Sequence, residues 1–280
     1  MDYLQKAKRF RTKKRLGQNF LINADVIKSI PDFIGVNKED TVLEIGPGIG
    51  FVTELLCKKA KKVIAVEIDE QAIEELKKLN ADNLVIVQND ILKTDISSLC
   101  DEKIKIVANI PYYITTPIIA HILGEIDDLN NKNRNCITDM ILMVQEEVAR
   151  RITATEKSSG KQYGLLTILS QFWSECKFVK VVGRRSFYPS PKVNSALVTF
   201  KIKEKPLLEL SNYQHFRKTV KAAFAQRRKN LKNCLLSAGF DKENIFNALK
   251  KLNIPENERG EDLSIETFGK LSEALLDGND

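Results

Sequence analysis

Short runs of apolar residues alternate with longer stretches in which apolar positions recur every three or four residues. The apolar runs occupy 41–45, 63–66, 84–87, 104–109 and 140–144. The helical stretches between them occupy 24–33, 51–59 and 71–79, and another begins at 115. Strands that are apolar throughout and alternate with helices are typical of a parallel sheet covered on both faces. This part of the chain therefore predicts an α/β fold.

The pattern changes after the fifth apolar run. Polar stretches at 127–135 and 155–162 predict loops, and the second of them precedes a predicted helix at 165–173. Two further strands are predicted at 178–182 and 196–202. Because they follow each other in the sequence, we expect an antiparallel hairpin that closes the sheet.

Strand signals stop near the end of this hairpin. From 211 onward only helical periodicity remains, and a Glu-Lys-Pro linker lies at 204–206. We therefore predict three parts: a basic N-terminal arm at 1–20, an α/β domain at 21–203 and a smaller all-helical domain at 207–280.

Glycines and acidic residues mark the ends of the first three predicted strands. Gly46, Gly48 and Gly50 follow the first strand, Glu67 follows the second and Asp90 the third. Glycines permit a tight turn and a close approach of the backbone to a ligand. Carboxylates at strand ends can accept hydrogen bonds from ribose hydroxyls or an amino group, and open parallel sheets bind ligands at this edge. The spacing GxGxG differs from the dinucleotide pattern GxGxxG, so we expect an adenosine without a pyrophosphate.

The fourth predicted strand ends in Asn-Ile-Pro-Tyr at 109–112. An amide, a rigid proline and an aromatic ring at a buried strand end suit a planar substrate. Taken alone, the same residues also fit a plain turn with Tyr112 packed in the core, since strand ends often carry Asn and Pro.

Basic residues cluster at 1–16 and at 215–232, and the second cluster contains no acid, in a chain whose formal net charge is +7. Such runs are often only solvated faces. Two separate clusters favour a polyanion partner, because each neutralised phosphate releases counterions. Nucleic acid fits better than a membrane surface, which requires an apolar face beside the charge.

The totals exclude several other classes. With 280 residues, 43% hydrophobic and 29% charged, the chain has the composition of a globular protein. It contains no apolar run near the roughly 20 residues of a membrane span, and its N-terminus lacks the apolar segment of a secretory signal. No two of the five cysteines have CxxC spacing, and neither histidine lies near a cysteine or carboxylate cluster. We therefore expect reduced thiols, a cytoplasmic location and no metal site.

The motifs together resemble a known family. Residues 44–50 (Glu-Ile-Gly-Pro-Gly-Ile-Gly) are similar to the first motif of S-adenosylmethionine-dependent methyltransferases, and 109–112 to the motif of enzymes that methylate exocyclic amines. Three further segments narrow the match, at 17–21, 187–193 and 223–229. The set resembles the ribosomal RNA adenine dimethyltransferase family, in particular its bacterial small-subunit members, from about 11 to 268.

This resemblance implies a Rossmann-like methyltransferase sheet, a smaller C-terminal all-helical domain that binds RNA, and S-adenosyl-L-methionine as cofactor. The cofactor-binding residues it implies are Asn19, Leu21, Gly46, Gly48, Glu67, Asp90 and Asn109. The catalytic residues it implies are Asn109, Ile110, Pro111, Tyr112 and Phe187. The two basic clusters and a basic segment after the sixth strand supply the predicted RNA contacts: Lys13, Lys14, Arg15, Arg184, Arg185, Arg227, Arg228 and Lys229. We expect the last three to lie on a helix over 223–231.

The implied reaction transfers methyl groups to the N6 amines of two adjacent adenosines in the 3′-terminal hairpin loop of 16S rRNA during ribosome biogenesis. Its partners are this rRNA and the assembling small subunit, and we expect a monomer. By resemblance, the Asn109 side-chain oxygen and the Ile110 carbonyl accept the amine hydrogens. Tyr112 and Phe187 form a slot around a base that has left its stack.

Three other functions share parts of these motifs. The first is a large-subunit (23S) rRNA adenine methyltransferase that confers macrolide resistance, and the second is a non-catalytic RNA-binding assembly factor. The third is a methyltransferase of DNA adenine or of a glutamine amide, which carries Pro where Ile110 stands. The segment at 223–231 and the Gly-Glu-Asp-Leu-Ser tail at 260–264 favour the small-subunit enzyme.

Overall fold

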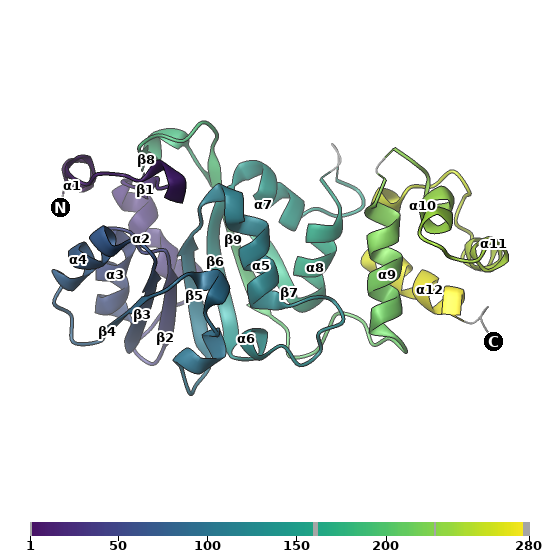
Figure 1. Cartoon of the computed structure of the whole chain (residues 1–280), viewed down its shortest axis with the longest axis horizontal. Helices are drawn as coiled ribbons and strands as arrows, with labels where there is room; N and C mark the ends of the chain where they lie inside the picture. Colours follow the sequence, from purple (N-terminus) through teal and green to yellow (C-terminus); the bar gives the residue numbers. More distant parts are fainter. Residues whose placement is uncertain (1, 159–161, 227, 277–280) are drawn as a thin grey trace. The chain divides into compact units, whose positions relative to one another are not determined.

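The computed structural model describes residues 2–158, 162–226 and 228–276 (Figure 1). Its internal contacts group the chain into two compact units. The first unit consists of Met1–Gly124, Asn130–Ala149 and Glu175–Glu204. The second consists of Glu125–Leu129, Arg150–Ser174 and Lys205–Asp280. The predicted domain limits at 203 and 207 remain a prediction, and the contacts assign α8 (Leu165–Trp173) to the second unit.

A seven-stranded sheet forms the centre of the first unit, with the strand order β4-β3-β2-β5-β6-β9-β7. The strands are β2 (Thr41–Ile45), β3 (Lys62–Glu67), β4 (Leu84–Gln88), β5 (Ile104–Asn109), β6 (Ile137–Gln145), β7 (Ser174–Val182) and β9 (Ser195–Ile202). Neighbouring strands from β4 to β6 are parallel, and β9 runs antiparallel to β6. Every residue of β2 is buried, which requires cover on both faces. The α/β prediction is confirmed.

Several helices of the first unit match the predicted helical stretches. The helices of the first unit are α1 (Tyr3–Arg9), α2 (Ala24–Phe33), α3 (Phe51–Lys59), α4 (Glu70–Lys77), α5 (Thr115–Leu123) and α6 (Lys132–Asn135). The boundary between the two units falls within α7 (Glu146–Ile152). The bounds of α2 and α3 match the prediction residue for residue. The loop predicted at 127–135 was wrong in its last part, because α6 forms there with the Asn131 side chain accepting a hydrogen bond from the backbone N–H of Arg134.

The N-terminal segment is packed against the first unit and is not a free arm. Ala7 of α1 is fully buried, and the ring of Tyr3 meets that of Phe51 edge to face at 4.7 Å. Phe10 packs in the same manner on Phe20 at 5.3 Å. Phe20 belongs to β1 (Phe20–Leu21), which pairs antiparallel with β8 (Phe187–Tyr188). The predicted basic arm is therefore a segment whose aromatic residues are anchored in the core.

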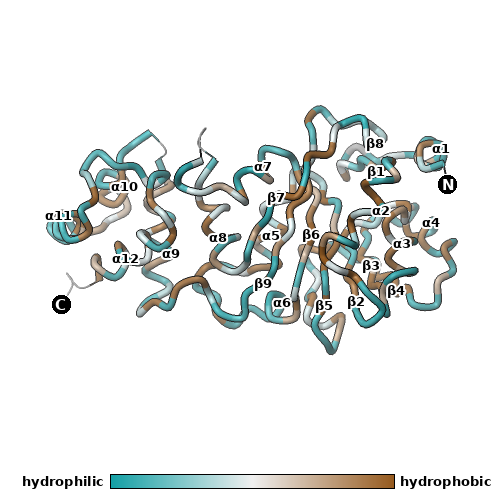
Figure 2. Tube along the Cα trace, turned by 180° about the vertical axis from the view of Figure 1, so that it is seen from behind, coloured by the Kyte–Doolittle hydropathy of each residue, from teal (hydrophilic) through white to brown (hydrophobic). Residues whose placement is uncertain are grey.

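The second unit is helical, with α8 followed by α9 (Tyr213–Phe224), α10 (Leu231–Ser237), α11 (Lys242–Lys251) and α12 (Ile265–Leu276). Phe216 of α9 stacks on Phe172 of α8 at 5.4 Å, and both rings are fully buried. In Figure 2, apolar colouring follows the sheet strands, while connecting loops are mostly hydrophilic. No helix in the described part of the chain is long and apolar enough to cross a membrane.

The helix predicted over 223–231 is wrong. Helix α9 ends at Phe224, and α10 begins at Leu231 after a turn. The Asn230 side chain caps α10 by accepting a hydrogen bond from the backbone N–H of Asn233 at 2.9 Å. An asparagine at this position favours the start of a new helix over the continuation of the old one. Arg228 and Lys229 thus lie on a turn between two helices.

We expect Phe216→Ala to lower the free energy of unfolding by about 3 to 5 kcal/mol, because it leaves a cavity under α8. Phe246, which is 48% exposed on α11, is the matched control, and its alanine variant should change stability by less than about 0.5 kcal/mol. Urea unfolding followed by circular dichroism measures both. Equal losses in the two variants would contradict this packing.

Candidate active site

A cavity of about 270 Å³ lies where β2, β3, β4 and β5 end. Each of these strands contributes the residues that directly follow it, and the segment Leu16–Leu21 closes another side. Ten of the predicted site residues line this one cavity: Asn19, Leu21, Gly46, Gly48, Glu67, Asp90, Asn109, Ile110, Pro111 and Tyr112. Residues far apart in the sequence thus meet at the edge where open sheets bind ligands.

The glycine loop between β2 and α3 forms the floor of the cavity. Gly46 and Gly48 have φ angles of +65° and +57°, which favour glycine. A Cβ atom at Gly48 would lie 2.8 Å from the Phe20 ring. On α1, the Lys6 ammonium donates a hydrogen bond to the Ile49 carbonyl at 3.1 Å. The loop is therefore held by the N-terminal segment as well as by the strand before it.

Glu67 connects this loop to the start of α4. Its Oε2 accepts a hydrogen bond from the backbone N–H of Gly48 at 2.9 Å, and its Oε1 accepts from those of Ile68 and Asp69 at 2.8 and 2.9 Å. Burial raises the pKa of Glu67, and these hydrogen bonds oppose the rise. Oε2 retains acceptor capacity, since each carboxylate oxygen has two lone pairs. The side chain can thus order the loop and still accept a ligand hydroxyl.

Glu44 also lines the cavity, although the sequence analysis did not select it as a site residue. It is 4% exposed, and its Oε2 has no hydrogen-bond partner among the described residues. Burial, with a contribution from nearby Glu67, raises the pKa of Glu44 to about 8. The signal in the sequence was a single charged residue inside an apolar strand. A buried acceptor without a partner is suited to a donor group on a ligand.

Two apolar residues complete the wall between the acids. Ile68 and Ile91 directly follow Glu67 and Asp90, and both line the cavity. Ile68 is 51% exposed, an unusual position for a large apolar side chain. Asp90 Oδ1 accepts from the backbone N–H of Leu92 at 3.0 Å, which leaves Oδ2 for a further donor. The position of Ile68 and Ile91 directly after the strand-end acids was the signal in the sequence that was missed.

The end of β5 presents the predicted amide and aromatic ring. Asn109 Nδ2 donates to the Asn19 carbonyl at 3.2 Å, which orients the amide. Asn109 Oδ1 has no partner among the described residues. The Tyr112 hydroxyl pairs with Ser195 Oγ of β9 at 2.8 Å, and burial raises the pKa of Tyr112. Both side chains are therefore held in one orientation by neighbours outside the motif.

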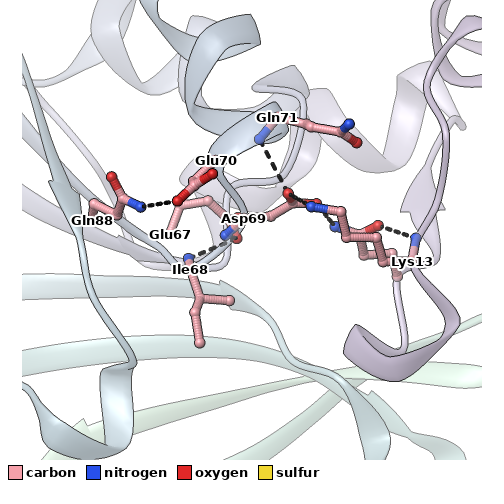
Figure 3. Close-up of polar contacts among 8 residues, drawn as sticks. Lys13, Glu67, Ile68, Asp69, Glu70, Gln71 and Gln88 are labelled. Atoms are coloured by element: carbon pink, nitrogen blue, oxygen red, sulfur yellow. Dashed lines mark hydrogen bonds and ion pairs between the residues drawn. The ribbon is translucent and has the colours of Figure 1, made fainter.

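Asp69 ties the segment before Asn19 to α4 (Figure 3). Its Oδ1 accepts from the Lys13 ammonium at 2.6 Å, and its Oδ2 from Gln18 Nε2 at 2.7 Å. Gln18 Oε1 in turn accepts from the backbone N–H of Lys13 at 2.8 Å. Burial alone would raise the pKa of Asp69, but the hydrogen bonds from Lys13 and Gln18 outweigh it and lower the pKa. Lys13, predicted as an RNA contact, is thus ion-paired beside the cavity.

Phe187 is not among the residues that line the cavity. Its side chain is 3% exposed in the core of the first unit, and its backbone pairs with Leu21 across β1 and β8. The structure therefore places its backbone beside that of a cavity residue, and its contact with a base stays a prediction.

The remaining predicted RNA contacts fall in different surroundings. Arg15, Arg184, Arg185, Arg228 and Lys229 are exposed. The side chain of Lys14 is not described, and Arg227 lies outside the described residues. The cluster at 215–232 has no acid in its sequence but is partly neutralised by acids from elsewhere in the chain: Arg217 pairs with Glu125 at 2.9 Å, Lys221 with Glu125 at 3.4 Å, and Lys232 with Glu256.

In residues 2–158, 162–226 and 228–276, no group of three or more His, Cys, Asp or Glu side chains could hold a metal ion.

The sheet order, the antiparallel β9 beside β6 and the glycine loop facing strand-end acids define the class as a Rossmann-like S-adenosylmethionine-dependent methyltransferase. Residues 9–277 match the family described as ribosomal RNA adenine dimethylase. The chain belongs to this family, whose methyl donor is S-adenosyl-L-methionine.

Comparisons with individual proteins support the same family assignment. The chain is 41% identical over 274 residues to the ribosomal RNA small subunit methyltransferase A of Clostridium botulinum (strain ATCC 19397 / Type A), covering 96% of this chain and 95% of that protein. Its fold is similar to a crystal structure of a dimethyladenosine transferase from Plasmodium falciparum, with a TM-score of 0.74, 29% identity and coverage of 92% and 96%. It is also similar to the 23S rRNA methyltransferase ErmE, with a TM-score of 0.70, 27% identity and coverage of 92% and 99%.

We expect Glu44→Gln to flatten the dependence of stability on pH. Because the pKa of Glu44 rises from 4.5 to about 8 on folding, the folded chain holds a proton that the unfolded chain has lost. The free energy of unfolding therefore falls as pH rises through this window and stays low above it. In the variant, this decrease in the free energy of unfolding should be absent. In the wild type it amounts to about 1.4 kcal/mol for each unit by which folding raises the pKa of Glu44.

Urea unfolding at several pH values within and beyond this window measures the difference between variant and wild type. Glu54→Gln, at an exposed ion pair with Lys58 on α3, provides the control. An unchanged pH profile in Glu44→Gln would show that Glu44 is not protonated in the folded chain.

Proposed function

We propose that this chain transfers methyl groups from S-adenosyl-L-methionine to the N6 amines of two adjacent adenosines in the 3′-terminal hairpin loop of 16S rRNA. The products are N6,N6-dimethyladenosines formed during ribosome biogenesis in the cytoplasm. The observation that carries the proposal is the Asn109 amide, which lines the cavity and is held by the Asn19 carbonyl through Nδ2, so that Oδ1 has no partner among the described residues. The small-subunit relatives, at 41% identity over nearly the whole chain, support the choice of RNA.

The cavity residues fit the cofactor. Glu44, as an unpartnered buried carboxyl, suits its ammonium group, and Glu67 Oε2 suits a ribose hydroxyl. Asp90 Oδ2 can accept from the adenine amine, with Ile68 and Ile91 packing on the ring. The bound cofactor supplies an electrophilic methyl group on a sulfonium. The nearby Tyr112 ring can favour that positive charge through its π face.

The chain's own contribution to the chemistry is positioning. The adenine amine is a poor nucleophile because its lone pair is delocalised into the ring. Asn109 Oδ1 and the Ile110 carbonyl accept its two hydrogens and favour a pyramidal nitrogen whose lone pair faces the methyl group. Pro111, with φ of −57°, fixes the backbone at this point. No covalent enzyme intermediate is needed: the methyl–sulfur bond would break as the bond to N6 forms, and the amine proton would then pass to water.

Tyr112 serves as one wall of the base slot, with its ring fixed through Ser195. The target adenosine must leave its stack to enter, which favours a hairpin loop. Phe187 would form the other wall if it moves from its buried place when RNA binds. The slot is formed from residues of a single copy of the chain, which supports a monomer.

Exposed cations supply the contacts to RNA phosphates. Arg15, Arg184 and Arg185 belong to the first unit, and Arg228 and Lys229 to the turn between α9 and α10. Such contacts give affinity and register and carry no base identity. In this proposal the first unit is catalytic, and the helical C-terminal part binds RNA on the assembling small subunit.

The alternative substrate is 23S rRNA, since the structurally similar ErmE is a 23S rRNA methyltransferase. Transfer of tritiated methyl groups to small subunits that lack the modification, with large subunits in parallel, separates the two. Primer extension then locates the modified adenosines. Transfer to large subunits alone would overturn the proposal.

We expect Asn109→Ala to lower kcat for methyl transfer to small subunits by about 100-fold to 1,000-fold, as for the loss of one positioned polar group in an active site. The KM for RNA should change little, because phosphate contacts are untouched. Asn133→Ala is the control, since that amide lies outside the cavity. In cells, a variant that lacks dimethyladenosine yet fully replaces the wild type would instead favour a non-catalytic assembly factor.

We expect the double variant Arg184→Ala/Arg185→Ala to raise the KM for small subunits and to reduce the salt slope of RNA binding by about one to two. The site of methylation should stay the same, because these cations do not contact base edges. Lys77→Ala/Lys78→Ala removes the same charge from exposed ion pairs on the end of α4. An equal rise in KM in both double variants would mean that only net charge matters.

A further inference from the structure

Asp69 lies next to the site but does not line the cavity itself. Its carboxylate is fully buried, whereas the Lys13 side chain is 30% exposed. It also caps α4, because Oδ1 accepts from the backbone N–H of Gln71 at 3.1 Å. A cap needs only one acceptor, yet both oxygens are used.

We infer that Asp69 is a positioning residue for methyl transfer, acting on Asn109 through Gln18 and Asn19. The inference rests on the proposed function. Asp69 Oδ2 fixes the Gln18 amide at 2.7 Å, and Asn19 is the next residue along the chain. The Asn19 carbonyl accepts a hydrogen bond from Asn109 Nδ2 at 3.2 Å, so the orientation of the Asn109 amide depends on the position of this carbonyl.

We call the contacts that link Asp69, Gln18, Asn19 and Asn109 the relay. The donor and the acceptor of each hydrogen bond in it are defined. Gln18 donates to Asp69 through Nε2 and accepts from the Lys13 backbone through Oε1. Turning the Gln18 amide over would set its NH₂ group against the Lys13 N–H, so its orientation depends on an acceptor at Asp69. The Lys13 ammonium compensates the buried charge of that acceptor.

The same relay closes the cavity. Residues Leu16–Leu21 line it, and Gly17 packs on the opposite wall: a Cβ atom there would lie 3.1 Å from the Tyr113 ring. Asp69 therefore seats the segment that carries Asn19 and Leu21 on the cofactor cavity. It follows that Lys13 serves this segment and is not available to RNA phosphates.

The test reverses the polarity of the relay. Asp69→Asn keeps an acceptor for the α4 cap but replaces Oδ2 by a donor that faces Gln18 Nε2. Gln18→Glu places a second carboxylate against Asp69. Combined, the two changes restore both hydrogen bonds, because the carboxylate introduced at position 18 accepts from the amide introduced at position 69 and from the Lys13 backbone. The double variant also keeps a negative charge beside Lys13.

We expect each single variant to lower kcat for small-subunit methylation by about tenfold to a hundredfold, the effect of a displacement of about 1 Å at a reacting group. The double variant should recover most of this loss. The KM for RNA should stay constant. Glu74→Gln, at an exposed ion pair on the same helix, is the control.

A second readout separates this inference from the proposed function. S-adenosyl-L-methionine binding, measured by calorimetry without RNA, should weaken about tenfold in each single variant and recover in the double variant. Wild-type affinity and kcat in Asp69→Asn would overturn the inference, as would losses that the double variant does not repair. Failure of the wild type to methylate small subunits would overturn the proposed function while the binding result still tests the relay.

Lys13→Met gives a variant that leaves the α4 cap untouched. A positioning role predicts a lower kcat with an unchanged KM for RNA. A raised KM with unchanged kcat would make Lys13 a phosphate contact and would overturn its assignment to the relay.

Discussion

The site depends on one buried carboxylate and the backbone groups around it. Glu67 accepts hydrogen bonds from three backbone N–H groups, one in the glycine loop and two at the start of α4. A charge with this little exposure is tolerated only when donors surround it, so the two loops are held at a fixed separation. The cavity keeps its shape because the Glu67 side chain, which can bind a ligand, also connects the two loops that line the cavity.

A second layer of contacts keeps the reacting groups in register. Asn109 is oriented by a carbonyl of the N-terminal segment, and Tyr112 by a serine of the antiparallel strand β9. Both supports come from parts of the chain far from the motif in sequence. The motif therefore supplies the chemistry, while the fold supplies the orientation that positional catalysis needs.

Sequence periodicity predicted most of the fold because each element has one strong apolar face or a continuous apolar run. Helices α2, α3 and α8 agree with the prediction at both ends. Helix α1 was missed because its basic residues dominate the pattern and its buried contacts are aromatic residues from elsewhere. In the site, most of the residues selected from the motifs line one cavity, whereas Glu44, although it lies within the first motif, and Asp69 were not selected.

The reason is that their roles exist only in three dimensions. A carboxylate without a partner, or one shared by Lys13 and Gln18, cannot be recognised from spacing along the chain.

Pairing also changes the electric field of the basic segment on α9. Arg217 and Lys221 lie beside Glu125, and Arg217 also pairs with Asp127, so these four charges cancel and their field decays much faster than that of a lone charge. At physiological ionic strength, with a Debye length of about 8 Å, the pull on a distant RNA comes from the cations that have no acidic partner, so capture from solution depends on fewer charges than the 44 Lys and Arg residues suggest.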